Sequence, residues 1–65
     1  MDERISGDCE MAITQLSAAI QAVVRVFHHD RSMKRLAADI EAAQQHIRSA
    51  SEVLADARVI AETNI

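Results

Sequence analysis

The sequence predicts an all-α protein that folds as an antiparallel two-helix hairpin. Composition is the first reason: the 65 residues include no proline, one glycine and one aromatic residue, which leaves little to punctuate β-strands. The second reason is an apolar repeat with helical spacing in each half of the chain. The third is a short polar stretch between the two halves. We therefore expect one helical-hairpin domain covering residues 1–65.

The first helix is expected over about residues 7–28. Residues 1–5 precede the first helix signal and are expected to fray, and Ser6 is the preferred N-cap, with Asp8 as its rival. An apolar row then follows in steps of four and three residues: Cys9, Ile13, Leu16, Ile20, Val23 and Phe27. Other apolar residues flank this row, so the apolar face is wider than one neighbouring helix requires.

The second helix is expected over about residues 32–62. Its apolar row alternates steps of three and four residues: Met33, Leu36, Ile40, Ala43, Ile47, Ala50, Leu54, Ala57 and Ala61. Either Asp30 or Ser32 can cap this helix. Because the connection is short, the helices must run antiparallel, and facing positions have residue numbers that sum to about 63. Large residues then face small ones, as Ile20 faces Ala43.

This register predicts that the end of the second helix overhangs the start of the first. Burying a valine or isoleucine side chain stabilises a protein by roughly 1.5 to 3 kcal/mol, so we expect a second copy of the chain to cover the overhang. The hairpin should assemble into a homo-oligomeric helical bundle, most simply a dimeric four-helix bundle. The predicted oligomer interface consists of Leu54, Ala57, Val59, Ile60, Ala61, Val53 and Val24.

Charge is distributed unevenly along the chain, whose net charge is −3. Residues 25–35, which we call the basic tip, carry four basic and one acidic side chain and so a net charge of +3. The N-terminus of a helix also favours anions. Candidate anion-binding residues at the tip are Arg31, Lys34, Arg35, His28 and His29. The alternative interpretation is that these side chains are solvated surface charges.

No catalytic constellation is recognisable in the sequence. Cys9 and His46 are expected to be packing residues, because no nucleophile, base and orienting group converge on either of them. No glutamate stands three residues before a histidine, which excludes the Glu-x-x-His pattern of di-iron bundles. We therefore predict no enzymatic activity, no cofactor and no metal site.

The preferred functional hypothesis is a small, non-enzymatic helical oligomer that acts by protein–protein binding. Such a protein would be a regulator, inhibitor or adaptor of bacterial or phage type. The alternative is an anion-binding bundle that binds RNA, or sequesters a phosphorylated nucleotide signal, through the basic tip. The acidic start of the chain is unlike a signal peptide, and no apolar run reaches the roughly 18 residues of a membrane span, so we expect a soluble cytoplasmic protein without membrane contacts.

Overall fold

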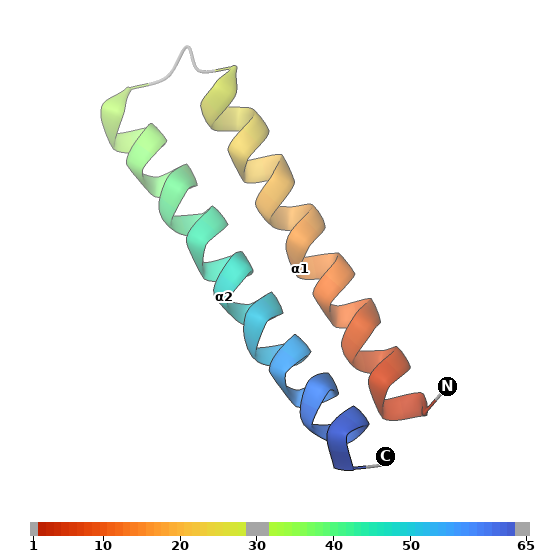
Figure 1. The fold of residues 1–65 in the computed structure, drawn as a ribbon. Helices are drawn as coiled ribbons and strands as arrows, with labels where there is room; N and C mark the ends of the chain where they lie inside the picture. Colours follow the sequence, from red (N-terminus) through yellow and green to blue (C-terminus); the bar gives the residue numbers. More distant parts are fainter. Residues whose placement is uncertain (1, 29–31, 64–65) are drawn as a thin grey trace.

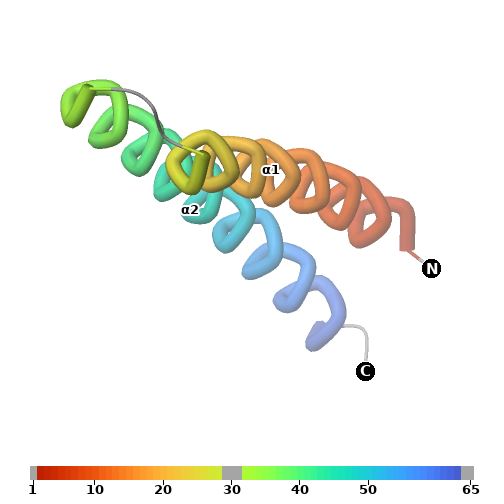
Figure 2. Tube along the Cα trace, turned by 90° about the horizontal axis from the view of Figure 1, so that it is seen from above, coloured from red at the N-terminus to blue at the C-terminus, as the bar shows by residue number. Residues whose placement is uncertain are grey.

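The computed structural model describes residues 2–28 and 32–63. This part of the chain forms two α-helices, α1 (Glu3–Phe27) and α2 (Met33–Thr63). The helices lie side by side and antiparallel, with both chain ends at the end opposite the connection (Figure 1). Figure 2 shows that they are inclined to each other, and the Cα trace measures 49 × 14 × 11 Å. The predicted all-α hairpin is therefore confirmed.

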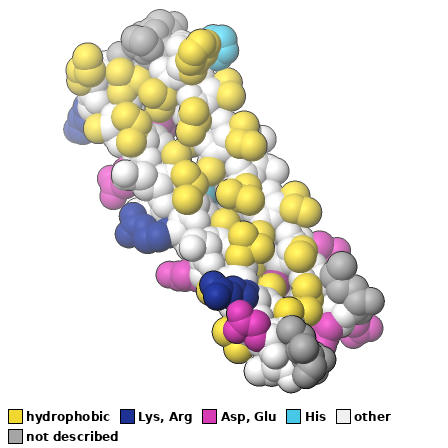
Figure 3. Space-filling view, viewed as in Figure 1, with side chains coloured by type: hydrophobic (Ala, Val, Ile, Leu, Met, Phe, Trp, Pro, Cys, Tyr) yellow, Lys and Arg dark blue, Asp and Glu magenta, His cyan; other side chains and the backbone are white. Residues whose placement is uncertain are grey.

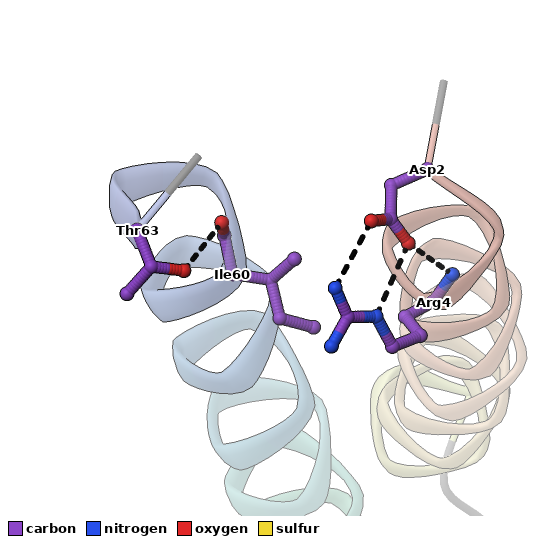
Figure 4. Close-up of polar contacts among 4 residues, drawn as sticks. All are labelled: Asp2, Arg4, Ile60 and Thr63. Atoms are coloured by element: carbon purple, nitrogen blue, oxygen red, sulfur yellow. Dashed lines mark hydrogen bonds and ion pairs between the residues drawn. The ribbon is translucent and has the colours of Figure 1, made fainter. Parts of the chain in front are cut away.

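Helix α1 begins four residues earlier than the sequence analysis predicts. The Asp2 side chain accepts a hydrogen bond from the backbone N–H of Arg4 at 2.8 Å, and the Asp2 carbonyl accepts one from Ser6 at 3.0 Å. The Arg4 guanidinium also contacts the Asp2 carboxylate at 3.1 Å (Figure 4). Asp2 is thus the N-cap in place of Ser6 or Asp8. Residues 3–5 are helical rather than frayed.

The other helix boundaries lie within one residue of the predicted ones. Helix α1 ends at Phe27 and α2 begins at Met33. The Ser32 hydroxyl oxygen accepts a hydrogen bond from the backbone N–H of Arg35 at 3.3 Å, so Ser32 acts as one of the two predicted caps. The other predicted cap, Asp30, lies outside the described residues.

The two helices pack against each other through small side chains. Within residues 2–28 and 32–63, the buried hydrophobic residues are Ala12, Ala19, Ala22, Ala43, Ala50, Ala57 and Ile60, and we call them the alanine seam. Ala22 is 0% exposed and Ala50 is 1% exposed. A methyl group occupies little space, so small side chains at these positions allow the two backbones to approach closely.

The predicted pairing of large with small residues is wrong. Ile20, which should face Ala43 across the interface, is 63% exposed. The small and large apolar rows have the same seven-residue spacing and adjoin each other on each helix, so the sequence pattern does not say which row faces the other helix. The alanine rows face inward, and the larger residues lie beside them on the surface. The wide apolar face predicted for the first helix in fact consists of two rows. One is an alanine row that is buried against α2, and the other is a row of larger residues that is exposed.

The predicted register is close to the observed one. His46 lies opposite Gln15, with 2.6 Å between His46 Nδ1 and Gln15 Oε1. Asp39 lies opposite Arg25, with 3.4 Å between Asp39 Oδ1 and Arg25 Nε. Residue numbers that sum to 63 would place residue 48 opposite Gln15 and residue 38 opposite Arg25, so the two pairs lie within two residues of the expectation.

The predicted overhang of the second helix is also wrong. Because α1 begins at Glu3, its first turn reaches the last turns of α2, and Ile60 is only 9% exposed. Figure 4 shows the Arg4 side chain of α1 extending toward Ile60 of α2. The hairpin thus covers Ala57 and Ile60 with its own first helix, and the case for a second copy must come from another surface.

Candidate functional site: an exposed apolar face

Large apolar side chains gather on one broad side of the hairpin. In Figure 3 they run along both helices from the connection to the open end, where the chain termini lie. Those that we call the apolar face are Ile13, Leu16, Ile20, Val23, Phe27, Met33, Ile40, Ile47 and Leu54. Their exposed fractions range from 40% at Leu16 to 81% at Met33. A continuous apolar surface of this kind marks an interaction site in a folded protein.

The spacing of the sequence explains why this face lies beside the seam. In α1, a large residue directly follows a seam alanine, as in Ala12–Ile13 and Ala19–Ile20. One residue of an α-helix turns the side chain by about 100°, because a turn contains 3.6 residues. The large residue therefore points roughly at a right angle to the direction of the other helix. This geometry exposes the whole row on one side of the hairpin.

A shallow groove runs through the apolar face where the two helices adjoin. Its volume is about 380 Å³, and its lining residues are Leu16, Ala19, Ile20, Val23, Val24 and Ile47. The lining is almost entirely apolar, so the groove offers hardly any partner for a hydrogen-bonding ligand. It fits apolar side chains better than a polar metabolite.

Two other depressions of the surface have more polar linings than the groove, one of them mixed and one mainly polar. One is lined by Gly7, Glu10, Met11, Thr14 and Gln15. The other is lined by Gln45, Arg48, Ser49 and Glu52. Met11 is the single large apolar residue among them, and it is 56% exposed. Nine of the twelve exposed large apolar side chains among the described residues thus belong to the apolar face, and Met11, Val24 and Val59 lie outside it.

Polar side chains interrupt the alanine seam near its middle and near the open end. The Gln15–His46 pair lies near the middle. Near the open end, Asp8 of α1 adjoins Asp56 of α2, and a hydrogen bond with Asp56, burial and the negative charge of Asp56 raise the pKa of Asp8.

The residues predicted at the oligomer interface fall into two groups. Val24, Leu54, Val59 and Ala61 are exposed, and Val53 is half-buried. Ala57 and Ile60 belong to the alanine seam and present little surface to a partner. Sequence reasoning assigned most of the apolar face to the inside of the hairpin. The signal that could have located it is the division of each repeat into a large row and an alanine row.

The structure describes three of the five candidate anion-binding residues. Lys34, Arg35 and His28 are exposed, and the His28 ring meets the Phe27 ring edge-on, with 5.2 Å between the ring centroids. His29 and Arg31 lie outside the described residues. The described side chains therefore form an open, charged surface at the tip.

Several other kinds of site find no support within residues 2–28 and 32–63. No three His, Cys, Asp or Glu residues of this part gather where they could hold a metal ion. Neither of the described helices has the length and hydropathy needed to cross a membrane. Cys9 is a half-buried free thiol. Comparison with protein-family models, with curated proteins and with solved structures finds no match for the chain.

Proposed function

We propose that this chain is a non-enzymatic, homo-oligomeric binding protein whose hairpins assemble through the apolar face. The simplest closed assembly is a dimeric four-helix bundle, in which each hairpin supplies two helices. The surfaces left outside the bundle would then bind a target protein. A small regulator, inhibitor or adaptor of bacterial or phage type fits this description.

The exposure of the apolar face is the observation that carries the proposal. Full burial of a valine or isoleucine side chain stabilises a protein by roughly 1.5 to 3 kcal/mol, so covering a half-exposed one contributes about 1 kcal/mol. The nine residues of the face together contribute about 9 kcal/mol, which is comparable to the association cost of roughly 4 to 15 kcal/mol. Inside the hairpin, by contrast, alanine methyl groups contribute little. A second copy therefore supplies the core that one hairpin lacks.

The described side chains favour a binding role over catalysis. The partner of His46 at the alanine seam is the Gln15 amide, which is not a nucleophile. The apolar groove offers few groups that could orient or polarise a substrate. Affinity for a target would come from exposed side chains on the outer surfaces of the bundle.

The net charge of +3 at the basic tip favours a second candidate function. An anion-binding bundle would use Lys34 and Arg35, with the N-terminus of α2, to hold an RNA backbone or a nucleotide phosphate. Binding of this kind weakens steeply as salt rises. A nucleotide thermal-shift panel and an RNA mobility shift at low salt, each with wild type and with Lys34→Ala/Arg35→Ala, test it directly.

Solution mass tests the proposed assembly. Light scattering of the wild-type chain over a range of concentrations should give a multiple of the 7.2 kDa chain mass. Ile20→Glu places a charge in the apolar groove and should lower the assembly constant at least tenfold. Met11→Glu is the matched control, because Met11 is similarly exposed but lines a different depression. A wild-type chain that stays a folded single copy at millimolar concentration overturns the proposal.

Native mass spectrometry of the protein purified from its host tests the binding role. We expect the oligomer to retain a second protein at a fixed stoichiometry, and the complex to survive moderate salt. Recovery of nucleic acid or a small molecule alone would favour the anion-binding function instead.

A further inference from the structure

We infer that the second copy lies on the apolar face in the opposite direction, so that the basic tip of each hairpin covers the open end of the other. The occupant of the face is thus another copy of this chain, in one of its two possible orientations. The inference rests on the proposed assembly through the apolar face and adds the relative direction of the two hairpins. The opposite charges of the two ends support it, and the spacing of the large residues is compatible with it.

The two ends of the hairpin carry opposite charge. The described residues of the basic tip have a net charge of +3, carried by Arg25, Lys34 and Arg35. At the open end, residues 2–10 carry four acidic and one basic side chain, and residues 52–62 carry three acidic and one basic, so the sum is −5. Figure 1 shows that these two segments lie at the same end of the molecule. The hairpin is therefore an electric dipole along its 49 Å length.

This dipole distinguishes the two orientations of a dimer. With the tips together, the +3 end meets a +3 end, and the −5 end meets a −5 end. With the tips apart, each +3 end meets a −5 end, and this happens twice because of the two-fold axis. The Debye length is roughly 8 Å at physiological salt, so exposed charges contribute mainly at short range, and the opposed orientation is the one that places ends of unlike charge together. Like charges facing each other also act against the wrong orientation.

The spacing of the large residues fixes where the two hairpins cross. Leu16 and Ile47 both line the groove and mark the middle of the apolar face. Seven residues from this middle layer toward the tip lie Val23 and Ile40, and seven residues toward the open end lie Cys9 and Leu54. The layers are thus evenly spaced, about 10 Å apart at 1.5 Å per residue.

A two-fold axis through the middle layer therefore brings the hairpins together layer on layer. Leu16 and Ile47 of the two copies meet at the axis. The Val23–Ile40 layer of each copy then lies on the Cys9–Leu54 layer of the other. The layers match without slip in the opposed direction and also with the tips together, so the choice between the two orientations rests on charge. The broad side of the Cα trace, 49 Å by 14 Å or roughly 700 Å² in projection, approaches the approximately 800 Å² per partner typical of stable complexes.

Distances between spin labels measure the orientation. In a Cys9→Ala chain, single cysteines are introduced by His28→Cys near the tip and by Ser17→Cys near the middle layer, both at exposed positions of the chain. The opposed dimer separates the two position-28 labels by about 36 Å along the axis, and the position-17 labels by only about 3 Å. The position-28 distance should therefore exceed the position-17 distance by at least about 15 Å. Equal distances mean that the tips lie together, which overturns the inference but not the assembly.

A second test removes positive charge from the tip and asks whether assembly weakens or strengthens. In this test Cys9 stays in place. Lys34→Ala/Arg35→Ala removes attraction from the opposed dimer and should weaken it about three- to tenfold at low salt, with the difference vanishing in about 1 M salt. In a dimer with the tips together, the same change removes repulsion and strengthens assembly, which overturns the inference. A control is Arg48→Ala/Gln45→Ala near the middle of α2, for which we expect little change. A single-copy mass for the wild-type chain overturns the proposed function, and the orientation with it.

Discussion

His46 Nδ1 of α2 lies 2.6 Å from Gln15 Oε1 of α1, and this hydrogen bond links the two helices across the alanine seam. With the Gln15 oxygen as acceptor, the imidazole N–H donates. This hydrogen bond forms in only one alignment of the two helices, whereas alanine methyl groups pack almost equally well after a shift along the helix. We therefore regard this pair, together with the Arg25–Asp39 contact, as a polar contact that selects the observed alignment of α1 with α2.

Gln15→Ala should lower the free energy of unfolding by about 1 kcal/mol, because it leaves a partly buried imidazole N–H without its partner. Gln15→Leu/His46→Leu should recover much of that loss, since neither polar group then remains. Urea unfolding followed by circular dichroism, at one fixed chain concentration, measures both changes. Gln45→Ala, at an exposed position, serves as the control. Equal loss in the single and double variants would show that the hydrogen bond is not the cause.

Ala50→Leu should destabilise the hairpin by roughly 1 to 3 kcal/mol, because the larger side chain must push the helices apart. Ala50 is buried in the alanine seam, where a methyl group fills the available space. The control is Ala55→Leu, which makes the same change at an exposed position of the same helix. Thermal unfolding of the two variants should differ clearly, and similar midpoints would argue against close packing at the seam.

Asp8→Asn should raise the melting temperature at pH 7. The folded state raises the pKa of Asp8, through its hydrogen bond with Asp56 and through burial, so folding favours the protonated group. The resulting stability is fully present below the unfolded pKa and is lost as pH rises through the folded one. The neutral amide avoids that loss.

The advantage of Asp8→Asn over wild type should therefore shrink as the pH falls toward 3. Melting curves of both proteins at pH 7, 5 and 3 measure this difference. Hydrogen bonds with Arg4 lower the pKa of Asp2, which has the opposite effect on stability, but this contribution is common to both proteins and cancels. Glu10→Gln is the control for a nearby loss of charge. An advantage that does not depend on pH would exclude the carboxyl pair as its origin.

Asp2→Ala should unwind the first turn of α1, because the backbone N–H of Arg4 loses its side-chain acceptor. Amide hydrogen exchange at residues 3–6 should accelerate, while exchange in the middle of α1 should change little. Asp2→Asn keeps a capping oxygen and should stay close to wild type. If both variants exchange alike, the Arg4 ion pair rather than the cap holds this turn.

The apolar repeat predicts the presence, direction and approximate ends of both helices, because seven-residue spacing is a strong helix signal. It does not predict the start of α1. Asp2 provides a cap upstream of Ser6, and Gly7 continues the helix with a negative φ angle and open space around it. The candidate site was misplaced for a different reason: Ile20 and Ala19 are both apolar and have the same period, so only packing decides which of them faces inward.

If the hairpins assemble as we propose, the interior made of methyl groups makes the stability of this fold depend on chain concentration. Ala22 and Ala50 are fully enclosed, yet they release little water on folding, so contact between two chains would supply most of the gain. We expect the midpoint temperature of unfolding to rise with the total concentration of the chain. Expression level would then set both the abundance of the protein and the fraction of chains that are folded. At low concentration, newly made chains would remain susceptible to proteolysis.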